Sequence, residues 1–276
     1  MPIRQHNHAG LALAIVGFAA LPSVAAAQAG PADAWRFGAS LYGYLPSLSG
    51  STSVPADSAG TPINVDAGKV VDSLKFTFMG ALEAHNGRWG VFSDLIYLHL
   101  GGDKQGSRDF SIGSIGLPAG TTADLSWNLK GWVWTVAGEY RVASDPAPLT
   151  LSVLAGTRLF DLKENLRWNI AGNLGPIAGP GRSGESENQG TLWDGIVGVK
   201  GRWAIGGSGR WHAPFYADIG TGRSDLTWQL AGGVSYAYPW GDVLAMYRHL
   251  AYDMKSGKSI KDLSFSGPMV GATFRW

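Results

Sequence analysis

The chain contains no cysteine among its 276 residues, and only 16% of them are Asp, Glu, Lys or Arg. The lack of cysteine excludes a disulfide framework and a thiolate metal site. The formal net charge is only +1 and no basic block is present, so we do not expect nucleic acid as a partner. No group of His, Asp and Glu residues has metal-ligand spacing, and we expect no cofactor.

Long apolar runs are absent after the first thirty residues, so a membrane could be crossed here only by strands. Residues 1–29 are typical of a cleaved signal peptide: Arg4 is their only formal charge, residues 11–21 are apolar, and VAAAQA supplies small residues for cleavage. Cleavage is expected after Ala29, with cleavage after Ala27 as the alternative, and an uncleaved membrane anchor is disfavoured by Pro22. We expect an exported protein with one domain over 30–276.

The rest of the chain alternates apolar with small or polar residues at period two, which places successive side chains on opposite faces of a sheet. The clearest case is LTWQLAGGVSYAY at 226–238. Residues 131–134 (GWVW) break the alternation, and we expect a bulge there that switches the faces. The pattern predicts ten strands, at 35–47, 73–85, 88–100, 123–141, 149–169, 191–205, 213–221, 225–238, 242–254 and 262–276.

The predicted connections differ in length at the two ends of these strands. Those after even-numbered strands are short, whereas 48–72, 101–122 and 170–190 are long and rich in Gly, Ser, Pro and Asp. Outer-membrane barrels have short periplasmic turns and long external loops. The sequence therefore predicts an all-β, antiparallel up-and-down transmembrane barrel of about ten strands, with eight or twelve as alternatives and both termini in the periplasm. A soluble β-sandwich is the alternative fold class.

Tryptophan positions support the barrel. Aromatic rings gather at both membrane interfaces of such proteins, whereas a sandwich core would place them in strand centres. Only Trp132 and Trp134 fall in the middle of a predicted strand. The other ten of the twelve lie near predicted strand ends: Trp35, Trp89, Trp127, Trp168, Trp193, Trp203, Trp211, Trp228, Trp240 and Trp276.

The last segment, SFSGPMVGATFRW, resembles the C-terminal signature of Gram-negative outer-membrane barrels, in which an alternating strand ends in an aromatic residue. That resemblance implies that Phe274 and Trp276 are read by the barrel-assembly machinery. Four other segments make the chain similar to a poorly characterised group of small proteobacterial outer-membrane proteins; they are SLKFTFMGALEA, RWGVFSDLIYL, DLTWQLAGGVSY and AMYRHLAYDM. The resemblance implies location and assembly, and it carries no catalytic assignment.

If the apolar faces meet lipid, the opposite faces point into the lumen. Asp94, Glu139 and Arg158 are further candidates for this inner face. Ten strands lie near the size at which side chains fill a barrel, and charges away from water need partners. The predicted lumen charges are Arg36, Lys75, Glu83, Lys130, Asp194, Lys200, Arg202, Asp218 and Arg248.

Three functions are consistent with this reading. The first is a structural or narrow-pore transport role with a charged, side-chain-filled lumen, and the second is ligand binding or adhesion through the long loops. The third is an outer-membrane hydrolase, for which His99 and His249 are the available histidines; neither forms a catalytic motif, so we expect no enzyme. The expected partners are outer-membrane lipid, lipopolysaccharide and the assembly machinery, with a monomer as the default state.

Overall fold

The computed structural model describes residues 34–52, 61–107, 111–112, 115–116, 121–143, 148–174, 177–178, 182–207, 209–256 and 260–276. The predicted signal peptide, 1–29, lies outside these residues. Within the ranges given, no helix has the length and apolar character needed to span a membrane.

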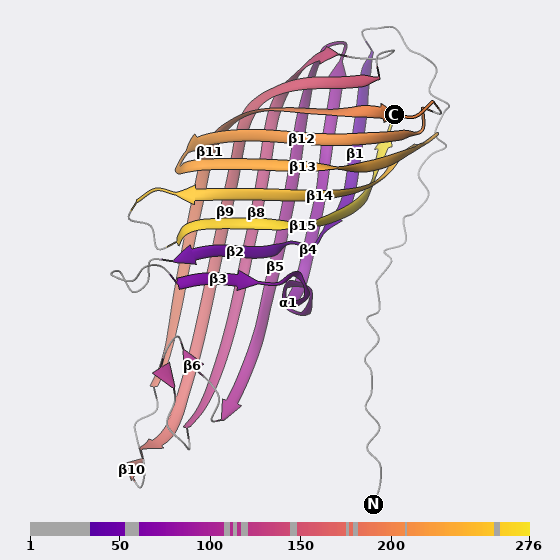
Figure 1. Ribbon diagram of the computed structural model, residues 1–276. Coiled ribbons are helices and arrows are strands. Elements are labelled where there is room, and N and C mark those ends of the chain that lie inside the picture. Colours follow the sequence, from indigo (N-terminus) through magenta and orange to yellow (C-terminus); the bar gives the residue numbers. More distant parts are fainter. Residues whose placement is uncertain are drawn as a thin grey trace, which may run out of the picture.

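Ten antiparallel strands form a closed barrel, because each pairs with the next and the last pairs back onto the first (Figure 1). The predicted up-and-down barrel is thus confirmed, including the short strand expected at 213–221. The barrel strands are β1 (Trp35–Tyr44), β4 (Leu74–Asn86), β5 (Trp89–Ser107), β8 (Thr121–Ala143), β9 (Leu149–Leu174), β11 (Arg182–Ile205), β12 (Trp211–Gly222), β13 (Ser224–Tyr238), β14 (Gly241–Met254) and β15 (Ile260–Arg275).

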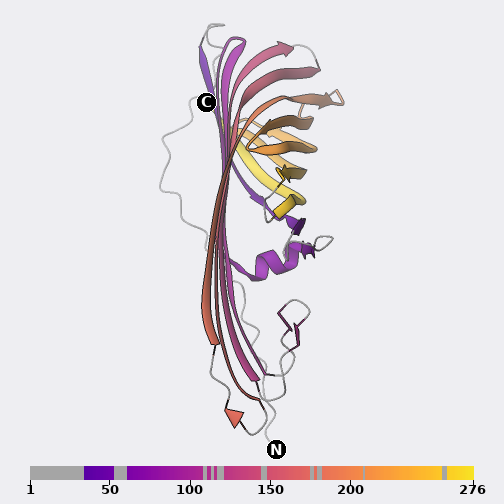
Figure 2. The same cartoon turned by 90° about the vertical axis from the view of Figure 1, so that its left-hand side faces the viewer.

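Two of the three long connections are shorter than predicted, because the strands beside them continue. Strands β5, β8, β9 and β11 have 19, 23, 26 and 24 residues, whereas β12 has 12 and β14 has 14. Figure 2 shows these four strands running far beyond the rest of the barrel as one curved sheet. We call this part, from about residue 101 in β5 to residue 192 in β11, the projecting sheet. Three two-residue strands lie beside its connections: β6 (Ser111–Ile112), β7 (Ile115–Gly116) and β10 (Ile177–Ala178).

The side chains of the projecting sheet are suited to water. Lys163, Arg167, Glu185 and Gln189 are all exposed. Glu185 accepts hydrogen bonds from Asn165 Nδ2 at 2.9 Å and from Arg167 Nε at 3.0 Å, and these bonds lower the pKa of its carboxyl group. A sheet with this surface is solvated rather than embedded in lipid.

The remaining long connection, predicted as a loop, folds into β2 (Ser47–Thr52), β3 (Thr61–Val65) and the short helix α1 (Ala67–Asp72). Strand β2 continues the direction of β1 along β15, and β3 pairs with β2. The hairpin and α1 lie at the same end of the barrel as the projecting sheet (Figure 2). Val70 of α1 is only 3% exposed and packs with Leu48 and Leu100, so the helix is held against this end of the barrel.

The outer face of the barrel carries a belt of exposed apolar side chains between two rows of aromatic rings. On β11, Trp193 and Trp203 are 49% and 57% exposed, and Val197 between them is 58% exposed. Ten residues span about 34 Å of strand, or about 26 Å of height at a tilt of about 40°. That height matches the apolar band of about 25 Å that outer-membrane barrels present to lipid.

The first aromatic row follows the short-turn end of the barrel. Rings stack or meet edge-on from Trp35 through Phe37 to Trp276, and from Trp211 through Tyr236, Tyr238 and Trp240 to Phe274. Such a continuous row marks one membrane interface.

The second row includes Trp132 and Trp134, which fall in the middle of a predicted strand. Strand β8 extends well past the membrane, so these rings lie at its other interface. Trp134 and Trp193 pair with Leu159 from either side and cover it, although Leu159 is on the outer face. The pairing is continuous through 131–134, so the predicted bulge there is wrong. The side chains of Trp127 and Trp168 lie outside the described part of the structure.

Candidate functional site

Two buried ion pairs lie in the middle of the lumen. Arg158 of β9 donates to Asp218 of β12, and neither side chain is exposed to solvent. Arg248 of β14 donates to Asp94 of β5 at 2.6 Å, across a part of the barrel that holds three other strands. Both guanidinium groups donate further hydrogen bonds: Thr135 and Thr227 accept from Arg158, while Gln229 and Tyr42 accept from the terminal nitrogens of Arg248.

An apolar layer fills the lumen between these ion pairs and helix α1. Its aromatic members stack, with the Phe160 and Tyr252 rings 4.9 Å apart. The layer consists of Tyr44, Met79, Ile96, Val133, Phe160, Leu192, Leu250, Tyr252 and Leu263, each at most 8% exposed. Met269 belongs to the same apolar cluster and extends it to the cavity described next. Together with the ion pairs and Val70 of α1, it occupies the lumen between the middle of the barrel and the projecting-sheet end.

The other half of the lumen holds a cavity of about 710 Å³. Its lining includes Ala34, which precedes β1, and Gly87 and Arg88 of the turn between β4 and β5. These residues lie at the short-turn end, so the cavity opens there. Arg248 and Asp94 line its inner end.

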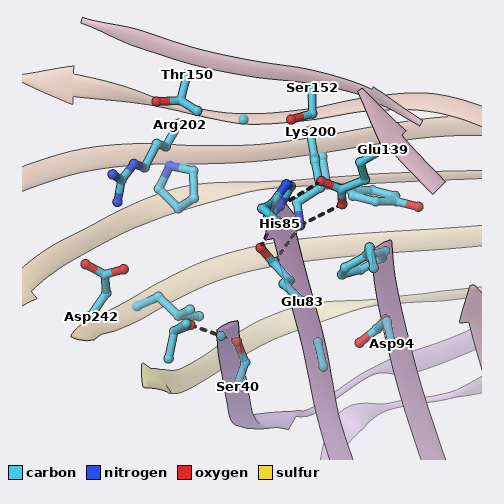
Figure 3. Close-up of a pocket in the computed structure, with 18 of the residues that line it drawn as sticks. Ser40, Glu83, His85, Asp94, Glu139, Thr150, Ser152, Lys200, Arg202 and Asp242 are labelled. Atoms are coloured by element: carbon cyan, nitrogen blue, oxygen red, sulfur yellow. Dashed lines mark hydrogen bonds and ion pairs between the residues drawn. The ribbon is translucent and has the colours of Figure 1, made fainter. Parts of the chain in front are cut away.

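A cluster of four charged or titratable side chains forms one wall of this cavity (Figure 3). Lys200 lies between two carboxylates, with Nζ 2.5 Å from Glu83 Oε1 and 3.1 Å from Glu139 Oε1. His85 Nε2 is 3.2 Å from Glu139 Oε2. The imidazole occupies the space beside Gly90, where a Cβ atom would lie only 2.2 Å from His85 Nδ1. A glycine is therefore required next to the cluster.

Arginines from four different strands surround the mouth of the cavity. They are Arg36 near the start of β1, Arg141 and Arg202 near the ends of β8 and β11, and Arg275 at the end of β15. Arg275 is paired with Asp242. In Figure 3, Arg202 and Asp242 lie on one side of the Lys200 cluster and Asp94 on the other.

Most of the predicted lumen charges do point inward. The cavity is lined by Arg36, Glu83, Lys200, Arg202 and Arg248. Asp218 lies in the ion-pair layer. Asp194 lies deeper, 1% exposed, where it accepts hydrogen bonds from the backbone and hydroxyl of Ser224 at 2.8 and 2.7 Å.

Two predicted lumen charges lie elsewhere. Lys130 is exposed and shares the outer face of β8 with Trp132 and Trp134, because the face-switching bulge assumed for 131–134 does not exist. Lys75 is exposed at a register shift between Leu74 and Phe76, and its side chain lies against Gly101. Neither takes part in the ion pairs of the lumen.

Sequence reasoning left Asp94, Glu139 and Arg158 as secondary candidates and placed His85 in a turn. All four are inward and buried. Their partners lie on strands that are not neighbours, so alternation could indicate the face but not the pairing.

The histidines considered for a hydrolase lie on the outer wall. The His249 ring lies against that of Trp228 in a tilted arrangement with centroids 4.5 Å apart, and its Nδ1 is 2.6 Å from Ser266 Oγ. His99 lies on the outer face of β5, paired in register with Lys130. In the described ranges, no three His, Asp or Glu side chains converge as metal ligands.

Phe274 and Trp276, the residues of the C-terminal signature, are 41% and 63% exposed on the outer face.

Comparisons with known proteins give similar structures only. No protein-family model matches the sequence, and no curated protein matches it. The outer membrane protease OmpT from Escherichia coli is 9% identical, with 88% of this chain and 97% of that chain covered at a TM-score of 0.49. The translocator domain of the autotransporter NalP from Neisseria meningitidis is 16% identical, with 88% of each chain covered and a TM-score of 0.41. The attachment invasion locus protein Ail of Yersinia pestis is 11% identical, with 88% of this chain and 98% of that chain covered at a TM-score of 0.32.

The closed ten-stranded barrel and its lipid-facing belt identify the chain as a small outer-membrane barrel. This conclusion depends on the pairing of β1 with β15 and on the spacing of the two aromatic rows, and not on the degree of similarity to any one of these structures.

Proposed function

We propose that this protein is a closed, non-conducting outer-membrane barrel that anchors the projecting sheet at the cell surface. The observation that carries the proposal is the continuous obstruction of half the lumen by two ion pairs, the apolar layer and Val70 of α1. A water-filled path needs a continuous polar lumen, as in barrels of 16–18 strands. The proposal therefore favours a structural role over a narrow pore, and it includes no enzymatic step.

In the proposed orientation, the projecting sheet is outside the cell and the short turns are in the periplasm. The exposed charged residues of the projecting sheet require water, and outer-membrane barrels place their long extensions outside the cell. The chain has no cysteine, so single cysteines can report the orientation without background labelling.

A labelling experiment on intact cells tests this orientation. Lys163→Cys on the projecting sheet should react with a membrane-impermeant maleimide, whereas Arg210→Cys beside a short turn should react only after the outer membrane is opened. The reverse pattern would show that the barrel is inserted the other way round.

Single-channel recording tests the closed lumen. The refolded protein, shown to be folded by its heat-modifiable gel mobility, should give no discrete conductance steps in a planar bilayer. A porin added afterwards to the same bilayer should give steps and so verify the membrane. Reproducible steps from the protein itself would overturn the proposal in favour of a narrow pore.

A second candidate function is binding of a surface ligand by the projecting sheet. The specific observation is its length, because β9 and β11 continue for more than ten paired residues beyond the last residue that β12 pairs, Asp194. Loss of cell-surface ligand binding in a variant with this sheet shortened, at unchanged barrel yield, would favour this function.

A further inference from the structure

The cavity is polar at its mouth and apolar toward its inner end. Arg36, Arg141, Arg202 and Arg275 line the mouth. The inner part is lined by Phe92, Tyr216, Met246 and Met269, of which Phe92, Tyr216 and Met269 are each 8% exposed. Its volume of about 710 Å³ lies within the range of small-molecule sites, about 300–1,000 Å³.

Every acidic residue of the lining has a basic neighbour, and basic side chains outnumber acidic ones: the lining has Arg36, Arg88, Arg141, Lys200, Arg202, Arg248 and Arg275 against Glu83, Asp94, Glu139 and Asp242. Asp242 is paired with Arg275, Asp94 with Arg248, and both Glu83 and Glu139 with Lys200. The cavity therefore has no unpaired carboxylate to attract a cation, and its remaining charge is positive.

Two arginines at the mouth contribute to that surplus. Among the described residues, no carboxylate lies within ion-pair distance of Arg36 or Arg141, both of which line the mouth. Arg141 Nε is moreover buried with no hydrogen-bond partner in the described part of the chain. A buried donor of this kind is costly unless an acceptor reaches it, and a guanidinium group fits carboxylate, sulfonate or phosphate oxygens.

We propose that the cavity binds a small amphipathic anion. Its oxygen-bearing head accepts hydrogen bonds from Arg36 and Arg141, and its apolar body lies against Phe92, Met246 and Met269. The ligand enters from the short-turn end, because the ion pair of Arg248 and Asp94 closes the other end. Binding at this site is independent of whether the barrel conducts ions.

The test uses the refolded full-length barrel in phosphatidylcholine nanodiscs, since detergent would compete for an apolar cavity. Calorimetry compares three naphthalene probes: the 2-sulfonate, the neutral 2-sulfonamide and the cationic 2-methylammonium, each corrected for empty nanodiscs. The sulfonate should bind saturably at one site, about tenfold or more tighter than the sulfonamide, as expected for hydrogen bonds to a charged group. The cation should not bind.

Variants locate the site. Arg36→Gln with Arg141→Gln should weaken sulfonate binding about tenfold or more, while Arg223→Gln, an exposed arginine at the opposite end, should leave it unchanged. Met246→Trp fills the inner part of the cavity with both arginines intact, and it should abolish binding. Heat-modifiable mobility verifies that each variant is folded. Equal affinity for the sulfonate and the sulfonamide, or unchanged binding in the double-arginine variant or in Met246→Trp, would overturn the proposal.

Discussion

Arg158 of β9 and Asp218 of β12, which are separated by one strand, form an ion pair inside the lumen in which neither side chain is exposed to solvent. Removing one partner of such a pair leaves an uncompensated buried charge, which costs about 3–5 kcal/mol. We therefore expect Arg158→Met to lower the free energy of unfolding by about that amount. Urea unfolding in lipid vesicles, followed by gel mobility, measures the change.

The matched control for this pair is the double variant Arg158→Met with Asp218→Leu. It removes both charges, so it should be more stable than Arg158→Met alone, because paired burial of charge gives little net stability. If the double variant loses as much free energy of unfolding as Arg158→Met and Asp218→Leu together, the two residues act independently.

The sequence was sufficient to predict the barrel, because lipid on one side of every strand imposes a strict alternation. The segment 213–221 was short and yet correctly assigned, since Phe215, Ala217 and Ile219 alternate with Tyr216 and Asp218. The same principle explains the failure at the strand ends. Residues 101–107 and 182–190 have left the membrane, so lipid no longer selects their outer face, and their polar composition resembled that of loops.

The interior was less predictable, because its contacts join strands far apart in the sequence. Arg248 meets Asp94, 154 positions away, and nothing in either strand indicates the other. A filled lumen was expected from the strand number, but the cavity was not. The volume that remains empty depends on the conformations of the side chains in the lumen. Lys130 lies on the outer face because the pairing continues without a bulge through 131–134.

A charge on the lipid-facing belt should destabilise the barrel according to its depth. Leu82 is 63% exposed and pairs in register with Ser93, near the middle of the belt. We expect Leu82→Arg to lower the free energy of unfolding by about 2–4 kcal/mol. Phe76→Arg is the control, because Phe76 contacts Tyr97 in the second aromatic row, and there the cost should be about 0–1 kcal/mol. Equal costs at both positions in vesicle unfolding would contradict the assigned membrane position.

The turn between β4 and β5 requires a left-handed residue at Gly87, whose φ is 59°. An L side chain costs about 1–2 kcal/mol in this region, and Asn tolerates it best. Gly87→Ala should therefore lower the free energy of unfolding by about 1 kcal/mol, and Gly87→Asn by clearly less. Urea titration of both variants measures the difference, and an Asn variant as unstable as the Ala variant would argue against the turn geometry.

The C-terminal residue joins the last strand of the barrel to the first. Trp276 exchanges backbone hydrogen bonds with Phe37 at 2.9 and 3.1 Å, and its ring stacks on Phe37 with centroids 6.0 Å apart. The resemblance of the last strand to the C-terminal signature predicts a second role in assembly. We expect Trp276→Ala to lower the amount of barrel inserted in the outer membrane of cells, measured by heat-modifiable mobility of membrane fractions.

Refolding in vitro separates that role from stability. Trp203→Ala is the control, because Trp203 is an exposed ring near the same end of the barrel, 57% exposed against 63% for Trp276. Without assembly machinery, the two variants should refold into vesicles to similar extents, since each loses one interfacial ring. In cells, only Trp276→Ala should lose yield. Equal yields of the two variants in cells would mean that Trp276 contributes to the aromatic row and not to recognition.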